Sequence, residues 1–111
     1  MTQENVSNVI EIKNKEQFAG VISSPILTIV DFWAEWCGPC RMMVPVLHKI
    51  AKDHPEIQLA TVNVDECQDL AMDFSVNSIP AVFFIKNGQI VDSFVWAMPE
   101  DEVLRKLEAN K

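Results

Sequence analysis

The stretch that decides how this chain is read is Trp36-Cys37-Gly38-Pro39-Cys40. Two cysteines three positions apart can close a small disulfide ring or present a reactive dithiol. If a helix begins after Gly38, this spacing puts both sulfurs on one helix face, and Pro39 suits the first turn because it has no N–H to leave unpaired. Cys37 then lies at the helix N-terminus, where free N–H groups and the helix dipole favour a thiolate. The sequence therefore predicts Cys37 as a nucleophile toward disulfides.

A zinc site is the alternative use of such a pair. Cys67 is the only further cysteine, and no second CxxC is present. His48 and His54 are spaced like the second half of a zinc finger, but only seven residues separate Cys40 from His48, against about 12–15 in a finger. On one helix those two side chains lie about 12 Å apart and cannot share a tetrahedral ion. The spacing favours redox chemistry, and no metal site is expected.

Length and composition limit the possible classes of protein. The 111 residues suit one domain, and 49% hydrophobic with 23% charged residues is an ordinary globular balance. The net charge of −7 argues against nucleic acid or an anionic membrane as a partner, because both would repel the chain. Residues 1–9 are polar and predict no secretory signal, and the apolar run 81–85 is far too short to span a bilayer. Two of the three cysteines are too close in sequence to crosslink the fold and are available for redox chemistry. Such use of cysteine is typical of proteins in a reducing compartment, so a cytoplasmic location is expected.

The pattern of apolar residues predicts alternating strands and helices. Asn14 with Gln17 and Asp65 with Gln68 are candidate helix caps, and Pro45 is expected to bend the longest helix. Asn87-Gly88 between two apolar runs predicts a hairpin with a type I′ turn. The predicted strands are 6–13, 26–32, 57–64, 81–86 and 89–95, and the predicted helices start after Asn14, span roughly 38–53, follow Asp65, and start at Pro99. The order βαβαβαββα predicts an α/β fold with helices on both faces of the sheet.

The residues 31–41, together with Pro45, Ile79-Pro80 and the hairpin at 86–88, resemble the thioredoxin family from about residue 8 to the end. The resemblance implies a thioredoxin fold with a central mixed five-stranded sheet. It implies a single domain over residues 1–111, in which residues 1–7 are a loosely ordered N-terminal extension. The WCGPC sequence is similar to that of the reducing members rather than the oxidising ones.

The same resemblance implies a general protein dithiol–disulfide oxidoreductase that maintains cell redox homeostasis. It would reduce disulfide-containing substrate proteins through a reversible Cys37–Cys40 disulfide. No bound cofactor is expected, since electrons would come from NADPH through a separate thioredoxin reductase. The chain is expected to be a monomer. An isomerase or oxidase, and a non-catalytic binding subunit that uses the same surface for docking, are the competing functions.

Three residues carry the expected chemistry. Cys37 attacks the substrate, Cys40 resolves the mixed disulfide, and Asp31 is the base that removes the proton from Cys40. Asp31 interrupts an apolar strand just before the CxxC, so desolvation should raise its pKa. A solvated aspartate at the end of the strand is the alternative.

The remaining expected site residues surround the cysteines. Trp36 is expected as an exposed cover of the thiols, with Gly38 and Pro39 making the turn, while Trp33 is expected to pack beneath the active loop. The resemblance implies a cis Ile79-Pro80 bond against the cysteines, which leaves the Ile79 backbone free to pair with an extended substrate segment. The expected substrate-binding residues are Trp36, Ile79, Pro80, Trp96 and Ala97.

Two positions depart from the pattern of the family. Thr61 stands where many members have a lysine near the buried aspartate, so we expect burial to be the main cause of a raised Asp31 pKa. Trp96 stands where the family has a small glycine. It is expected as an exposed residue that either contacts partners or narrows access, and the alternative is that it folds inward. Cys67 is either a buried inert thiol or an accessible regulatory one. His48 and His54 are expected on the surface.

Overall fold

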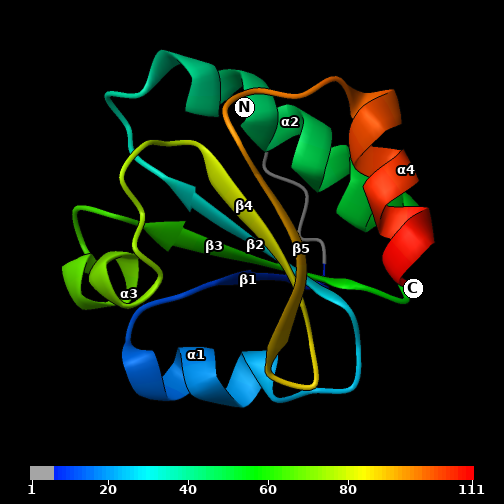
Figure 1. The fold of residues 1–111 in the computed structure, drawn as a ribbon, viewed down its shortest axis with the longest axis horizontal. Helices are drawn as coiled ribbons and strands as arrows, with labels where there is room; N and C mark the ends of the chain where they lie inside the picture. The colour runs from blue at the N-terminus through cyan, green and yellow to red at the C-terminus, as the bar shows by residue number, and fades with distance from the viewer. Residues whose placement is uncertain (1–6) are drawn as a thin grey trace.

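The computed structural model describes residues 7–111, in which five strands and four helices follow one another in the predicted order βαβαβαββα (Figure 1). The elements are β1 (Val9–Glu11), α1 (Lys15–Ile22), β2 (Thr28–Trp33), α2 (Gly38–Asp53), β3 (Gln58–Asn63), α3 (Gln68–Asp73), β4 (Ala81–Lys86), β5 (Gln89–Val95) and α4 (Glu100–Asn110). The expectation for residues 1–7 falls almost wholly outside the described residues.

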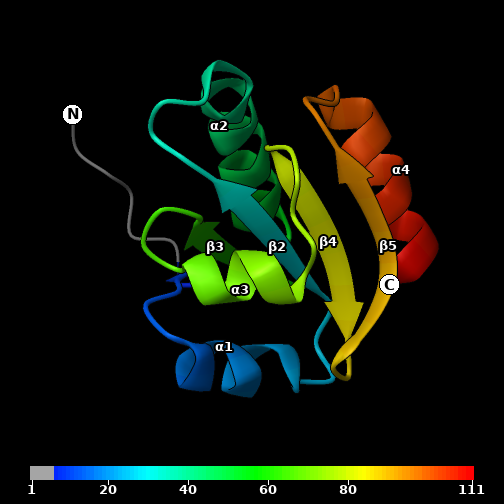
Figure 2. The same cartoon turned by 60° about the vertical axis from the view of Figure 1, so that its left-hand side comes forward.

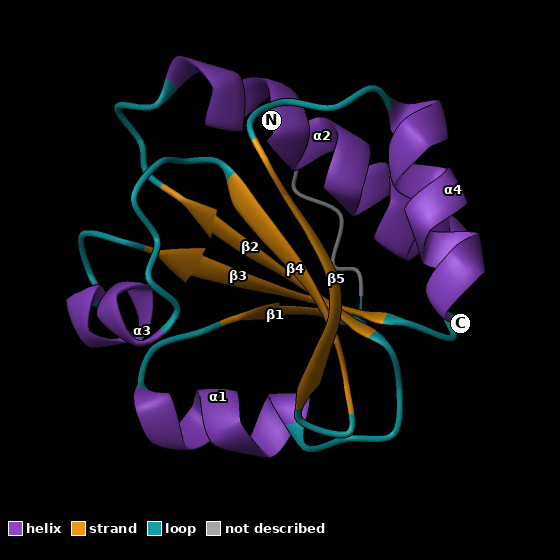
Figure 3. Ribbon diagram, viewed as in Figure 1, coloured by secondary structure: helices purple, strands orange, loops and turns teal. Residues whose placement is uncertain are grey.

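All five strands form one mixed sheet in the order β1-β3-β2-β4-β5. The strands β1, β3 and β2 are parallel, whereas β4 is antiparallel to both β2 and β5. Helices α1 and α3 cover one face of this sheet, and α2 and α4 cover the other (Figures 2 and 3). The predicted fold class is therefore confirmed.

Strand β2 runs through the centre of the sheet and divides its side chains between two cores. Ile29 packs on the α2 and α4 side with Leu47 and Leu107, whereas Val30 and Phe32 pack on the α1 and α3 side. Because side chains alternate along a strand, Asp31 points to the same face as Ile29, which is the face covered by α2. The centre of the fold thus places a carboxyl group beneath the helix that carries the cysteines.

Local sequence signals account for several element ends. The Asn14 side chain accepts a hydrogen bond from the Gln17 N–H at 2.8 Å, as a helix cap does. Asn87 and Gly88 have φ angles of 54° and 76°, the left-handed conformation that a type I′ turn requires. The predicted cap at Asp65 is wrong: α3 follows Cys67 with no side-chain cap, because the Asp65 carboxylate binds elsewhere.

The boundaries of α2 agree with the predicted span 38–53, and the helix continues through Pro45. The bend at Pro45 remains a prediction. Strands β4 and β5 have the predicted bounds, whereas β1, β2 and β3 are shorter than their predicted runs. The first covers only Val9–Glu11 of the predicted 6–13, of which residue 6 lies outside the described part. Within residues 7–111 no helix has the length and apolar character needed to cross a bilayer.

Candidate redox site

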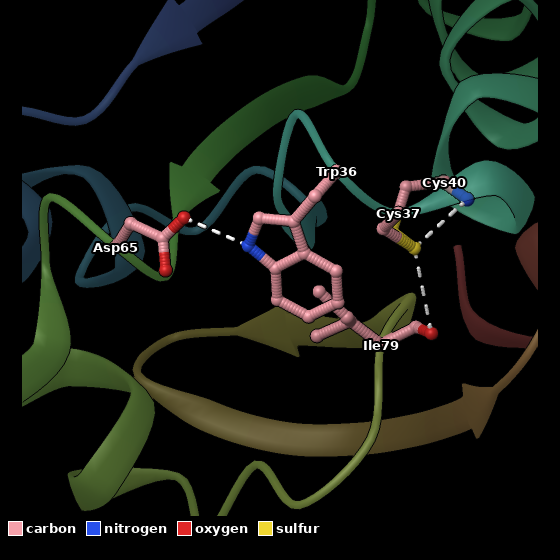
Figure 4. Close-up of a disulfide and its surroundings, with 5 residues drawn as sticks. All are labelled: Trp36, Cys37, Cys40, Asp65 and Ile79. Atoms are coloured by element: carbon pink, nitrogen blue, oxygen red, sulfur yellow. Dashed lines mark hydrogen bonds between the residues drawn. A yellow bond between two sulfur atoms is a disulfide. The ribbon is translucent and has the colours of Figure 1, made fainter.

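Cys37 and Cys40 form a disulfide at the start of α2. Cys37 is the N-cap residue, and its Sγ accepts a hydrogen bond from the Cys40 N–H at 3.2 Å (Figure 4). The same sulfur lies 3.6 Å from the carbonyl oxygen of Ile79. Pro39 occupies the first turn without an N–H of its own, so the Cys40 N–H is the donor of this turn that binds the Cys37 sulfur.

Both cysteines are buried, but only Cys37 lies at the N-cap of the helix. Cys37 is 4% exposed and Cys40 1%, and both pack in a small cluster with Ala34, Trp33 and Ile79. The position of Trp33 agrees with its expected packing beneath the active loop. When the disulfide is reduced, the N-cap position of Cys37 stabilises a thiolate, because the Cys40 N–H and the positive end of the helix dipole both favour negative charge there. This arrangement suits Cys37 for attack and Cys40 for resolution.

Trp36 is 67% exposed beside the disulfide, as the sequence predicted. Its indole Nε1 donates a hydrogen bond of 2.9 Å to Oδ2 of Asp65 (Figure 4). Sequence reasoning missed this role of Asp65. The available signal was topological: Asp65 and Trp36 follow β3 and β2, whose carboxyl ends are adjacent in a parallel sheet.

Asp31 is a buried carboxyl group with an oxygen atom that makes no hydrogen bond to the described residues. It is 1% exposed, and within the described residues its Oδ1 has no hydrogen-bond partner. Thr61 on β3 and Val82 on β4 are its neighbours in the sheet, and neither supplies charge. Burial raises the pKa of Asp31 from 3.8 to about 7. The expected cause of the raised pKa is confirmed, and the alternative of a solvated aspartate is wrong.

The peptide bond between Ile79 and Pro80 is cis, as the resemblance implied. The Pro80 carbonyl accepts a hydrogen bond of 2.8 Å from the Trp96 N–H, which fixes the end of β5 beside this loop. Trp96 is 59% exposed, so it does not fold inward. Ala97, in contrast, is half-buried and packs against the core beneath α2 and α4.

The remaining cysteine and the histidines lie apart from this site. Cys67 is 3% exposed, its Sγ lies 3.8 Å from the Ile12 carbonyl, and burial raises the pKa of its thiol. The buried alternative for Cys67 is therefore confirmed. His48 and His54 are half-buried rather than on the open surface, and burial lowers the pKa of His48. Among residues 7–111 no group of three or more His, Cys, Asp or Glu side chains is placed to hold a metal ion.

Comparison with known proteins assigns the family. The thioredoxin family model matches residues 9–109. Thioredoxin from Haemophilus influenzae is 38% identical over 99 residues, covering 88% of this chain and 92% of that protein. Mouse mitochondrial thioredoxin is 43% identical over 91 residues, covering 78% of this chain but only 55% of the mouse protein. The crystal structure of thioredoxin from Trypanosoma brucei brucei superimposes with a TM-score of 0.87 at 26% identity, covering 98% of this chain and 96% of that chain. The chain therefore belongs to the thioredoxin family, with Cys37 and Cys40 at the position of its cysteine pair.

Proposed function

We propose that this chain is a general protein-disulfide reductase that helps to maintain cell redox homeostasis. The observation that carries the proposal is the position of Cys37, whose Sγ accepts the Cys40 N–H at a helix start and lies beside the Ile79 carbonyl. A thiolate formed there is stabilised before any substrate binds. The whole chain over residues 1–111 is proposed as one thioredoxin domain.

The reaction proceeds through a mixed disulfide. The Cys37 thiolate attacks one sulfur of the substrate disulfide, forms a bond to it, and releases the other substrate sulfur as a thiolate. The Cys40 thiol then loses its proton and attacks Sγ of Cys37, which releases the second substrate sulfur. The substrate gains two electrons, and the chain is left with the Cys37–Cys40 disulfide. A reductase that draws on NADPH returns those two electrons.

Asp31 is the proposed acceptor of the proton from Cys40. A pKa of about 7 keeps the carboxyl group in both protonation states near neutral pH, which is what a general base requires. Its orientation toward the α2 face supports this role, since Cys40 is in the first turn of that helix. Thr61 adds no positive charge that would hold the carboxyl group ionised.

The proposed binding surface for substrate surrounds the disulfide. An extended substrate segment would pair with the backbone of Ile79, next to the cis Pro80, in the manner of a short added strand. Trp36, Trp96 and Ala97 would contact the side chains of this segment. Gly38 and Pro39, which have small side chains, would let the substrate disulfide approach Cys37. The exposed indoles of Trp36 and Trp96 support this assignment.

The proposed partners are disulfide-containing proteins and a separate thioredoxin reductase, with no cofactor bound to the chain itself. A monomer in the cytoplasm is the proposed state, and the net charge of −7 supports the proposal that it binds neither nucleic acid nor membrane. Relatives with mitochondrial and chloroplastic names are similar to this chain, so the location is tested separately by fractionation.

NADPH-coupled turnover tests the proposed function. The chain, a thioredoxin reductase and a protein disulfide such as that of insulin are mixed, and NADPH oxidation is followed. We expect steady turnover with the wild type and none with Cys37→Ser. With Cys40→Ser, the mixed disulfide should accumulate and should be visible by mass spectrometry. A non-catalytic docking subunit would bind the same partners whether or not Cys37 is present, and it would trap none of them covalently.

A further inference from the structure

Trp96 combines a strained backbone with an exposed side chain. Its φ angle is 76°, in the left-handed region that bulky residues rarely adopt. The other non-glycine residues with positive φ in the described part are Ser75 and Asn87, which have small polar side chains. The indole of Trp96 is 59% exposed, and it belongs to neither core. This conformation therefore costs free energy that burial of the side chain does little to offset.

Hydrogen bonds hold this strained residue beside the disulfide. The Trp96 N–H donates a hydrogen bond to the carbonyl oxygen of Pro80. The carbonyl oxygen of Ile79, the residue before Pro80, lies 3.6 Å from Sγ of Cys37. On the other side, Ala97 and Met98 pack on the core, and the Met98 N–H lies 3.3 Å from Sδ of Met43. Both flanks of Trp96 are thus anchored, so the indole is presented from a fixed backbone.

Three segments that meet at the disulfide and at Trp96 contain no charged residue, although Glu35, Arg41 and Glu100 flank them. The segments 36–40, 78–80 and 95–99 contain no Asp, Glu, Lys or Arg, although the chain as a whole carries a charge of −7. The carboxylate of Asp65 contacts these segments, and it accepts the hydrogen bond of Trp36. Val95, in the third of these segments, is an apolar side chain that is 62% exposed. An exposed aromatic side chain without charged neighbours in these segments favours the binding of apolar substrate side chains over charged ones.

We infer that Trp96 is a specificity-determining residue that selects substrates with a large apolar side chain next to the target disulfide. Strained conformations persist at sites where function requires them, and here the strain fixes an exposed indole at the entrance to the cysteines. The inference rests on the proposed reductase function and names the substrate class of that same site.

Two synthetic peptide disulfides test the inference. They differ only in the residue beside the cysteine, which is leucine in one and serine in the other. We expect the wild type to have a kcat/KM about tenfold higher for the leucine peptide, a factor within the range for one apolar contact. Trp96→Gly and Trp96→Asn, both of which tolerate positive φ, should reduce that ratio to near one. Trp96→Phe should retain most of it, and Ile90→Ser, an exposed substitution at the far end of β5, should leave it unchanged.

Thermal unfolding supplies an independent readout. Because glycine relieves the strain, Trp96→Gly should have a Tm equal to or above that of the wild type. A ratio that stays the same in Trp96→Gly, or a lower Tm that reveals an inward-packing indole, would overturn the inference. Failure of the wild type to reduce either peptide would instead refute the proposed reductase function, so the two failures are distinguishable.

Discussion

Replacing Asp31 with asparagine should change how the stability of this protein depends on pH. The wild-type carboxyl group is 1% exposed, and burial raises its pKa from 3.8 to about 7. Between these values the native state retains a proton that the unfolded state has released. The free energy of unfolding therefore falls as pH rises, by about 1.4 kcal/mol per pH unit from this group. Over the full interval the loss amounts to about 4 kcal/mol.

Urea unfolding of the oxidised protein at several pH values between 4 and 8.5 measures this effect. The disulfide is kept closed so that Cys37 and Cys40 do not titrate. Asp31→Asn has no titrating group at this position, so its free energy of unfolding relative to wild type should increase by about 4 kcal/mol between pH 4 and pH 8. Any cost of burying the amide is nearly independent of pH and cancels from the comparison.

Two results would refute this reasoning. A difference between the proteins that is constant with pH would mean that Asp31 titrates alike in both states, as a solvated carboxyl group does. A difference that shrinks as pH rises would mean that the native state stabilises the carboxylate, which requires a cationic or hydrogen-bonding partner that neither Thr61 nor Val82 provides.

Three further predictions follow from single contacts. Thr61→Lys should lower the pKa of Asp31, because it places a positive charge on the neighbouring strand; an unchanged carboxyl titration by NMR would contradict this. Asp65→Ala should speed hydrogen exchange at Nε1 of Trp36 and lower the free energy of unfolding by less than about 1 kcal/mol, whereas Asp65→Asn should not speed exchange. Equal exchange rates in both variants would show that the hydrogen bond contributes nothing. Cys67 should resist a thiol reagent in the folded protein and react once urea unfolds it; rapid modification without denaturant would contradict its burial.

Local signals in the sequence predicted much of the fold. The helical spacing of apolar residues and the CGPC motif predicted the bounds of α2, and Asn87-Gly88 predicted the hairpin. Both features were predictable because they depend on residues close together in the chain. The ends of β4 and β5 were also predicted, but those of the first three strands were less accurate. Pairing partners decide where a strand stops, and β1 retains only the residues that pair with β3.

The chemistry of the site and its contact with Ile79 were predictable, whereas the contacts of Asp65 and the backbone of Trp96 were not. Asp65 has the sequence of a helix cap, yet its carboxylate binds Trp36, 29 positions away in the chain. The left-handed backbone of Trp96 opposes the propensity of a bulky residue, and the hydrogen bond to Pro80 that accompanies it joins segments distant in sequence. Tertiary contacts of this kind leave no local pattern to read.

The pH dependence of alkylation of the reduced protein tests the central claim most directly. Iodoacetamide modification is followed by mass spectrometry, so that each cysteine is scored separately. Cys37 should react first, with an apparent pKa below the ordinary thiol value of about 8.5, while Cys40 remains unmodified over the same range. Equal inertness of both thiols up to alkaline pH, or faster reaction at Cys40, would contradict the claim.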